Sequence, residues 1–385
     1  MKKIISAVLA AVLFITGTAA AFAAESDGRQ LQFNKDGKFK IMLLADPQDG
    51  YPIREDFIYL LNEALDKAEP DLVVFLGDNV MGADEWSLEK YKMGFDQMLA
   101  PIVEREIPFT LVFGNHDEES SPGLTKEQIL EIYQSFDGCL AYDAVPELHG
   151  CATHNLPILS SDGTHTAFNL WMMDSGSYAY TEKTGYHYDC VRRDQIEWYE
   201  QTSKALEKEN GAPVPSFMFQ HIVPADVAEQ VMVTLPFHLK NITDYNIEDG
   251  KSLSFLPNIF GFKSGLVGEI PCPSTENEGQ MDSISQRGDV LALFFGHDHV
   301  NDFVGVDDNG IRMGYVGGFG YLIDAERARQ VGADVDQRLP EGRRLDGERI
   351  RRETPSDEQP PGNRHDKNSP RPERPERAQQ VHLPR

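Results

Sequence analysis

Residues 71–79 have the sequence Asp-Leu-Val-Val-Phe-Leu-Gly-Asp-Asn, in which an apolar run ends at Gly77 and Asp78. A short run of branched and aromatic side chains predicts a buried strand over residues 71–76. The glycine allows a sharp turn directly after the strand, and the carboxylate that follows it is a potential metal ligand. This stretch therefore predicts a strand whose end carries a reactive group.

Four other apolar runs end in the same way. They are residues 41–45 before Asp46, residues 110–114 before Asn115 and His116, residues 217–220 before His221, and residues 293–296 before His297 and His299. In open α/β sheets, ligands gather outside the carboxyl ends of the strands. We therefore expect the five strand ends to converge on one site.

Amphipathic segments separate the first three of these strands. Apolar residues at helical spacing predict helices over residues 54–68 and 88–103. Residues 39–44, 71–76 and 109–113 then form the strands of a βαβαβ unit, which is typical of an α/β protein.

The later part of the chain continues the alternation of helices and strands. Thr125 and Gln128 have the spacing of a capping box, which predicts the start of a third helix. A further helix is expected over residues 192–210, where Gly211 ends it. Further strands are expected over residues 167–173, 215–219 and 290–295.

Residues 224–288 do not fit this alternation. The segment is long, weakly periodic and interrupted by glycine and proline. We interpret it as an irregular insertion, of the kind that more often forms a functional lid than an inert loop.

Composition and charge limit the classes of partner. The chain has 385 residues, 40% of them hydrophobic, and its 36 basic and 62 acidic residues give a net charge of −26. The hydrophobic content permits a sizeable core, whereas the acidic charge disfavours binding to a phosphate backbone, so no nucleic acid partner is expected beyond a possible substrate. After residue 24, no apolar run is long enough to predict a transmembrane helix.

Residues 1–23 have the pattern of a signal peptide. Lys2 and Lys3 precede an apolar run over residues 4–16, and Ala21-Phe22-Ala23 provides a cleavage site. We expect cleavage after Ala23 and export of the chain, as a secreted, periplasmic or cell-surface protein. No cysteine follows the expected cleavage site, so no lipoprotein anchor and no stable membrane anchor is expected.

An oxidising destination permits disulfides without demanding them in a chain of this size. Cys139 and Cys151 are close enough in sequence to pair across one excursion of the chain. Cys190 and Cys272 complete the set, and none of the four has the spacing of a structural zinc site.

Residues 24–325 form the expected folded domain, and residues 326–385 differ from it in composition. This tail has 13 arginines, one lysine and 12 acidic residues, and it has no phenylalanine, tryptophan or tyrosine. Such a segment cannot bury enough apolar surface to offset its ordering entropy, so we expect it to be disordered. Two alternatives stay open, namely a tail for anionic partners and an aberrant, for example frame-shifted, sequence.

The five predicted strand ends offer the mixture of ligands that two adjacent cations need. Such a pair requires a bridging carboxylate, further carboxylate or amide oxygens, and imidazoles at the outer positions. Asp78 suits the bridging position. The pattern therefore predicts a dinuclear metal centre.

Three motifs follow one another along the chain: Gly77-Asp78-Asn79, Gly114-Asn115-His116-Asp117 and Gly296-His297-Asp298-His299. In this order they resemble the motifs of the calcineurin-like metallophosphoesterase superfamily, and most nearly its purple-acid-phosphatase-related branch. The resemblance spans residues 39–320. It implies a two-sheet α/β/β/α sandwich with the dinuclear site at the strand ends.

The resemblance also implies a set of metal ligands and two catalytic residues. It assigns Asp46, Asp78 and His299 to one metal ion, and Asp78, Asn115, His221 and His297 to the other. It further implies that His116 is the acid that assists the leaving oxygen and that Asp117 orients His116.

The implied reaction is hydrolysis of a phosphoric ester by in-line attack of a metal-bound hydroxide. The cofactors would be two divalent or mixed-valence metal ions of iron, manganese or zinc. The partner would be a small phosphorylated substrate, either a phosphomonoester or a phosphodiester, and residues 224–288 are expected to decide between them. The oligomeric state is not predicted.

Three positions depart from the family's patterns. Gln48 replaces the histidine of the usual Asp-x-His motif, so a neutral amide oxygen is the candidate ligand there. Met81 stands where the purple enzymes have a tyrosine, and residues 79–84 lack the arginine of the protein phosphatases. The purple colour and phosphoprotein specificity are therefore not expected. Gln48 also keeps an alternative open, a non-catalytic secreted binding protein that retains the fold with an impaired metal site.

Two further groups of residues permit two interpretations each. Glu118 and Glu119 shape the substrate mouth or are ordinary exposed acids of an acidic chain. The aromatic residues line a pocket for a base or a sugar, or they are explained by strand and hairpin packing. These aromatic residues are Trp171, Tyr178, Tyr180, Tyr186 and Tyr188.

Overall fold

A computed structural model gives the three-dimensional arrangement of most of the chain. It describes residues 29–82, 86–119, 121–182, 185–226, 232–235, 244–246, 252–257, 262–269 and 271–319. The expected signal peptide (residues 1–23) and the arginine-rich tail (residues 326–385) lie outside the described residues, and these expectations stay predictions.

The predicted βαβαβ unit is confirmed. It runs β2 (Ile41–Leu44), α1 (Glu55–Ala68), β3 (Leu72–Phe75), α2 (Leu88–Val103) and β4 (Phe109–Leu111). The three strands form a parallel sheet in the order β2-β3-β4. Leu44, Phe75 and Leu111 are in register, so the residues that follow each strand come to the same edge of the sheet.

The remaining large sheet has eight strands, in the order β1-β5-β6-β9-β14-β16-β15-β13. Its four central strands run parallel to one another; they are β6, β9, β14 and β16. Their predicted counterparts over residues 167–173, 215–219 and 290–295 are confirmed. The strands are β1 (Leu31–Gln32), β5 (His154–Leu159), β6 (Thr166–Met172), β9 (Ser216–Phe219), β13 (Phe262–Leu266), β14 (Val290–Phe295), β15 (Asp302–Val306) and β16 (Arg312–Tyr315).

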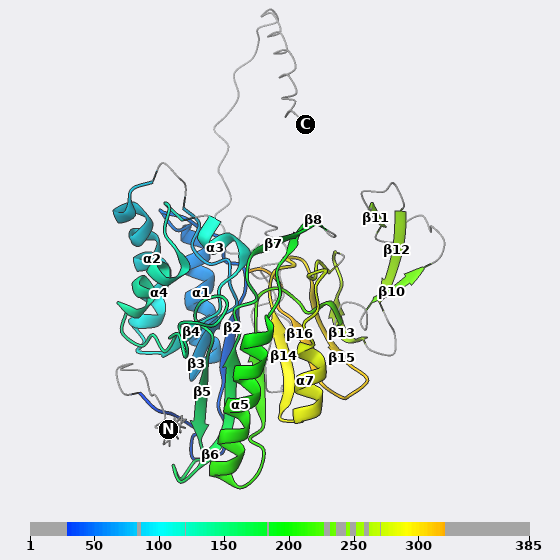
Figure 1. Cartoon of the computed structure of the whole chain (residues 1–385). Coiled ribbons are helices and arrows are strands. Elements are labelled where there is room, and N and C mark those ends of the chain that lie inside the picture. Colours follow the sequence, from blue (N-terminus) through cyan, green and yellow to red (C-terminus); the bar gives the residue numbers. More distant parts are fainter. Residues whose placement is uncertain are drawn as a thin grey trace, which may run out of the picture. The chain divides into compact units, whose positions relative to one another are not determined.

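The two sheets pack face to face with helices on both outer sides, which confirms the α/β/β/α sandwich (Figure 1). Helices α1, α2 and α4 (Lys126–Gln134) cover the small sheet, and α5 (Arg193–Asn210) and α7 (Gln280–Arg287) cover the large one. Alternate residues of β3 serve different layers: Val73 packs toward the helices, and Val74 packs between the sheets. Because both faces are buried, the strand sequence is continuously apolar.

The predicted helix ends are also confirmed. The Thr125 hydroxyl accepts a hydrogen bond from the Gln128 N–H, and the Gln128 side chain accepts one from the Thr125 N–H, which completes the capping box at the start of α4. Helix α5 ends at Gly211, whose φ of 77° is left-handed.

The prediction that residues 224–288 are irregular is wrong for the described strands and for α7, whereas residues 271–279 are irregular as predicted. Strands β10 (Met232–Leu235), β11 (Asp244–Asn246) and β12 (Ser252–Pro257) form an antiparallel sheet, while β13 joins the large sheet. Strands of three to six residues give too short a pattern for a clear periodic signal. The suggested Cys139–Cys151 disulfide is not present either, because both are buried free thiols.

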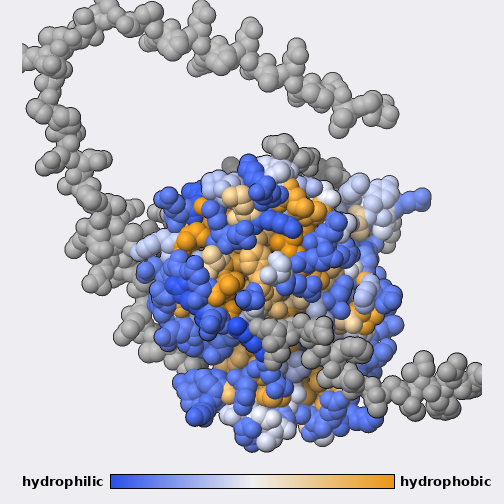
Figure 2. Space-filling view, turned by 90° about the vertical axis from the view of Figure 1, so that its left-hand side faces the viewer, coloured by the Kyte–Doolittle hydropathy of each residue, from blue (hydrophilic) through white to orange (hydrophobic). Residues whose placement is uncertain are grey.

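The helical face of the small sheet is largely hydrophilic, with apolar side chains between the polar ones (Figure 2). Among its exposed apolar residues are Leu88 and Met93 of α2. None of the helices in the described ranges is long and apolar enough to cross a bilayer.

Candidate metal centre

The segments that follow five strands bring the predicted ligands together. Asp46 follows β2, Asp78 follows β3 and Asn115 follows β4, while His221 follows β9 of the other sheet. His297 and His299 follow β14. Ligand atoms of Asp46, Asp78 and His299 all lie within 4.8 Å of one another, so one side chain from the large sheet meets two from the small sheet.

The Asp78 carboxylate lies between two groups of donors. Its Oδ2 atom is 3.2 Å from Nε2 of His221, and that same nitrogen is 3.1 Å from Oδ1 of Asn115. Oδ1 of Asp46 is 3.5 Å from Nε2 of His299 and 4.0 Å from Nε2 of His221. Asp78 is therefore shared between a His221–Asn115 group and an Asp46–His299 group, as a bridging ligand must be.

His221 is held with one particular nitrogen toward the carboxylates. Its Nδ1 atom donates a hydrogen bond to the Leu76 carbonyl oxygen at 2.7 Å, which leaves Nε2 facing Asp78. Burial alone lowers the pKa of His221, but the Asp78 and Asp46 carboxylates outweigh burial and raise it to about 10. Burial likewise opposes charge on Asp78, yet the facing His221 imidazolium holds the pKa of Asp78 below its usual value. The pocket is therefore built to surround positive charge.

Two buried ligand atoms in this cluster lack a hydrogen-bond partner. They are Oδ1 of Asp46 and Nε2 of His297. Burial lowers the pKa of His297 to about 3, and the neutral imidazole that results is the form that binds metals. Unsatisfied buried polar atoms are rare in folded proteins. The donor set therefore fits metal ions, which would satisfy both atoms.

Backbone strain is concentrated at the same place. Asp46, Gln48, Asp78 and His297 have left-handed φ values of 48°, 44°, 53° and 74°, although left-handed backbone is unfavourable for residues other than glycine. Strained backbone of this kind persists where the surrounding structure over-determines it, typically at functional sites.

Glycines allow the strand ends to approach one another. Gly77 has a φ of 94°, and a Cβ atom there would lie 2.6 Å from the backbone nitrogen of Gly114. A Cβ atom on Gly114 would lie 2.2 Å from Oδ1 of Asp78. Both positions therefore exclude any side chain while the ligands keep their places.

The strand ends described above all lie in a part of the chain that matches a known family. A model of calcineurin-like phosphoesterases matches residues 39–301. The chain belongs to the calcineurin-like phosphoesterase family. The resemblance recognised from three sequence motifs is thereby confirmed.

Individual relatives place the chain near the purple acid phosphatases. It is 31% identical to "Probable inactive purple acid phosphatase 14" of Arabidopsis thaliana, over 88% of this chain and 86% of that protein. It is 29% identical to "Probable inactive purple acid phosphatase 29" of the same plant, over 82% of each chain. It is also 30% identical to "Phosphatase DCR2" of Saccharomyces cerevisiae, over 76% of this chain and 50% of that protein. Among solved structures, a dimetal phosphatase from Danio rerio aligns with a TM-score of 0.46 and 13% identity, over 73% of this chain and 87% of that one.

Asp117 of this phosphoesterase, which the resemblance assigns to orienting His116, makes its hydrogen bonds to backbone groups. Its carboxylate turns inward and accepts hydrogen bonds from the N–H groups of Asp78, Asn79 and Gly114 at 2.7–2.9 Å. Burial and the nearby Asp78 raise the pKa of Asp117 to about 6. The role that the structure supports for Asp117 is to hold the ends of β3 and β4 together.

Glu119 instead contacts the His116 ring. Its Oε2 atom lies 2.6 Å from Nδ1 of His116, and the His116 N–H donates to Oδ1 of Asp78 at 2.8 Å. Both residues lie in α3 (Asn115–Glu119). The three-residue spacing of one helical turn is the sequence signal that could have predicted this pair.

Gln48 lies beside the proposed bridging carboxylate. Its side-chain Nε2 donates a hydrogen bond to Oδ2 of Asp78 at 3.3 Å, and its backbone N–H donates to the Asp78 carbonyl oxygen at 3.0 Å. In this arrangement the amide presents a donor to Asp78. Whether Gln48 ligates a metal stays a prediction.

Proposed function

We propose that this phosphoesterase hydrolyses small phosphoric monoesters or diesters with a dinuclear metal centre, and that it works after export. The observation that carries the proposal is the position of Asp78 between the His221–Asn115 group and the Asp46–His299 group. Two bound ions of iron, manganese or zinc would activate water and neutralise charge on the phosphoryl group. Export is supported by the sequence pattern of residues 1–23 alone.

The ligands divide between the two positions as the family motifs imply. Asp46, Asp78 and His299 would hold one ion, and Asp78, Asn115, His221 and His297 would hold the other. The hydrogen bond from Nδ1 of His221 to Leu76 keeps Nε2 toward the ions. Asp117 keeps Asp78 and Gly114 at their close approach through three backbone hydrogen bonds.

His116 is placed to give a proton to the leaving oxygen. Its side chain is 37% exposed at the edge of the centre, and its backbone is fixed to Asp78. The Glu119 carboxylate accepts a hydrogen bond from Nδ1 of His116 and holds the ring in place. Nε2 is then the nitrogen available to the substrate, as general acid catalysis requires.

A non-catalytic binding protein with an impaired metal site is the second candidate. Gln48 at the position of a family histidine favours it, and so do the two plant relatives whose names call them inactive. The yeast relative named as a phosphatase favours the enzyme. The two candidates differ in whether the folded protein turns over a phosphoric ester.

Hydrolysis of p-nitrophenyl phosphate and of bis-p-nitrophenyl phosphate separates them. We expect the purified protein to hydrolyse at least one of the two esters, and Asp78→Ala to abolish this activity. Asp36→Ala is the matched control, because the Asp36 side chain is 63% exposed and pairs with Lys38 instead of any of the proposed ligands. No turnover by the folded protein, with turnover gained in Gln48→His, would establish the non-catalytic alternative. N-terminal sequencing of the exported protein tests cleavage after Ala23.

A further inference from the structure

A hairpin of two short strands carries four tyrosines on one face. Strand β7 (Tyr178–Thr181) pairs with β8 (Gly185–Tyr188), and Tyr178 lies opposite Tyr188 while Tyr180 lies opposite Tyr186. Residues two apart in a strand point to the same side. The four rings therefore form one surface, which we call the tyrosine face.

The inner pair of the tyrosine face touches the metal centre. The Asn115 side chain donates a hydrogen bond to the Tyr178 hydroxyl at 3.0 Å. The Tyr188 ring meets the His297 ring edge to face, with centroids 4.4 Å apart. Strands β7 and β8 accordingly lie beside α3 at one end of the molecule (Figure 1). The tyrosine face is thus continuous with the proposed reaction site.

The outer pair extends from this site into solvent. Tyr180 is 64% exposed and Tyr186 is 82% exposed, and their ring centroids are 5.5 Å apart. Two residues of a strand span roughly 7 Å, which is the distance by which the outer pair lies further along the hairpin. Packing against the core therefore explains the inner pair better than it explains the outer pair.

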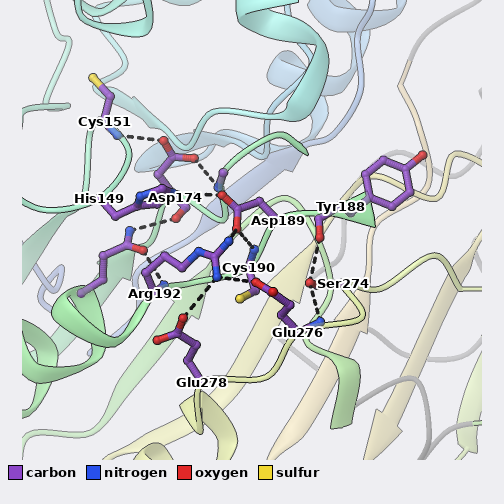
Figure 3. A network of polar contacts seen from close by, with 12 residues as sticks. His149, Cys151, Asp174, Tyr188, Asp189, Cys190, Arg192, Ser274, Glu276 and Glu278 are labelled. Atoms are coloured by element: carbon purple, nitrogen blue, oxygen red, sulfur yellow. Dashed lines mark hydrogen bonds and ion pairs between the residues drawn. The ribbon is translucent and has the colours of Figure 1, made fainter. Parts of the chain in front are cut away.

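A polar network anchors the base of the hairpin (Figure 3). The Ser274 hydroxyl donates a hydrogen bond to the Tyr188 carbonyl oxygen at 2.8 Å. The next residue, Asp189, forms an ion pair with Arg192, which also pairs with Glu276. The Tyr188 ring points away from this network (Figure 3). The network therefore fixes the backbone of β8 and leaves the tyrosine face available.

The chemistry of this face selects one kind of occupant. Four uncharged rings bind planar, apolar groups by stacking and recognise little by charge. A group that extends from the metal centre along the hairpin is the part of a substrate that is bonded to the phosphoryl group. We infer that the tyrosine face binds the leaving group of the substrate, and that the preferred esters carry a planar aromatic ring in that group. The inference rests on the proposed phosphoesterase function.

The test removes the outer pair and leaves the metal ligands intact. The Tyr180→Ser/Tyr186→Ser variant is compared with Tyr180→Phe/Tyr186→Phe, which keeps the rings, and with Tyr59→Ser, which removes an exposed tyrosine of α1. The substrates are naphthyl phosphate and hexyl phosphate, or their methyl diesters. Comparing variant with wild type for each ester cancels the difference in intrinsic reactivity. We expect the serine variant to lose about 10-fold in kcat/KM for the naphthyl ester and less than about 2-fold for the hexyl ester.

Equilibrium binding gives a readout that does not need turnover. Naphthylmethylphosphonate and hexylphosphonate have an uncleavable P–C bond, and we expect the serine variant to weaken binding of the naphthyl compound only. Equal effects on both compounds, or none, overturn the inference. If the serine variant hydrolyses the esters with an unchanged preference for the naphthyl ester, the inferred role of the tyrosine face is overturned but the proposed function stands. If the naphthyl compound binds in a tyrosine-dependent way but no ester is hydrolysed, the tyrosine face is supported as a binding surface for aromatic rings and the proposed phosphoesterase function is overturned.

Discussion

Replacing Gly114 with alanine tests how closely the strand ends must approach. The new Cβ atom would lie 2.2 Å from Oδ1 of Asp78, whereas ordinary contacts begin at 3.4 Å. The Asp78 side chain must therefore move by about 1.2 Å, and this displaces the proposed bridging carboxylate. A displacement of about 1 Å at a catalytic group can cost roughly 100-fold in rate, or about 2.7 kcal/mol. We expect Gly114→Ala to lose that factor in kcat/KM and to bind less metal.

The assay is hydrolysis of an aryl phosphate, together with metal content and circular dichroism of the same preparation. Gly317→Ala is the matched control, because its Cβ atom would make an ordinary 3.5 Å contact close to His299. We expect this control to stay within about 3-fold of wild type. A Gly114→Ala protein that keeps full metal content and full activity would refute the assignment of Asp78 as the shared ligand.

Three further predictions concern other residues. Lys126 is buried and contacts both carboxylate oxygens of Asp174 at 3.0 Å. Lys126→Met should therefore lower the free energy of unfolding, measured in urea, by about 3–5 kcal/mol. Burial lowers the pKa of His154 to about 4 from 6.5. The His154 ring therefore binds a proton more tightly in the unfolded chain than in the folded protein. The neutral buried ring contributes about 3 kcal/mol to the free energy of unfolding above pH 6.5, and this contribution is lost as the pH falls toward 4. His154→Gln should be less stable at neutral pH but should show a flatter acid limb in the same urea titrations. Glu119→Ala should lower kcat by about 10-fold without changing metal content, because His116 loses its orienting partner.

Each of these predictions has a contradicting result, and two of them have a matched control. Lys38→Met removes an exposed ion pair and should change stability by less than about 0.5 kcal/mol; an equally small effect of Lys126→Met would contradict the buried pair. An unchanged acid limb in His154→Gln would show that other groups govern acid unfolding. Glu118→Ala removes a neighbouring exposed acid, and an equal loss of kcat in that variant would assign the effect to charge in general.

The sequence predicted the βαβαβ unit because both faces of each strand are buried. Runs such as residues 72–76 are apolar throughout, so strand and helix differ clearly in length and spacing. The ligand-bearing strand ends followed from the same pattern, since parallel strands in register deliver their next residues to one edge. The spacing of residues along the sequence could not predict that strand ends of one sheet would meet strand ends of a second sheet.

Three features escaped prediction for physical reasons. Strands β10–β12 are too short for a periodic signal, and among the described strands they pair with one another. The inward turn of Asp117 depends on backbone N–H groups that only the folded loops bring together. The tyrosine face was visible as composition, but its continuity with Asn115 and His297 requires the folded hairpin.

The most direct test of the dinuclear centre is anomalous scattering from crystals of the protein loaded with Mn²⁺. We predict two peaks about 3.5–4 Å apart, with the Asp78 carboxylate between them. One peak should lie beside Asp46 and His299, and the other beside His221 and His297. A single peak, or two peaks that do not share Asp78, would contradict the account.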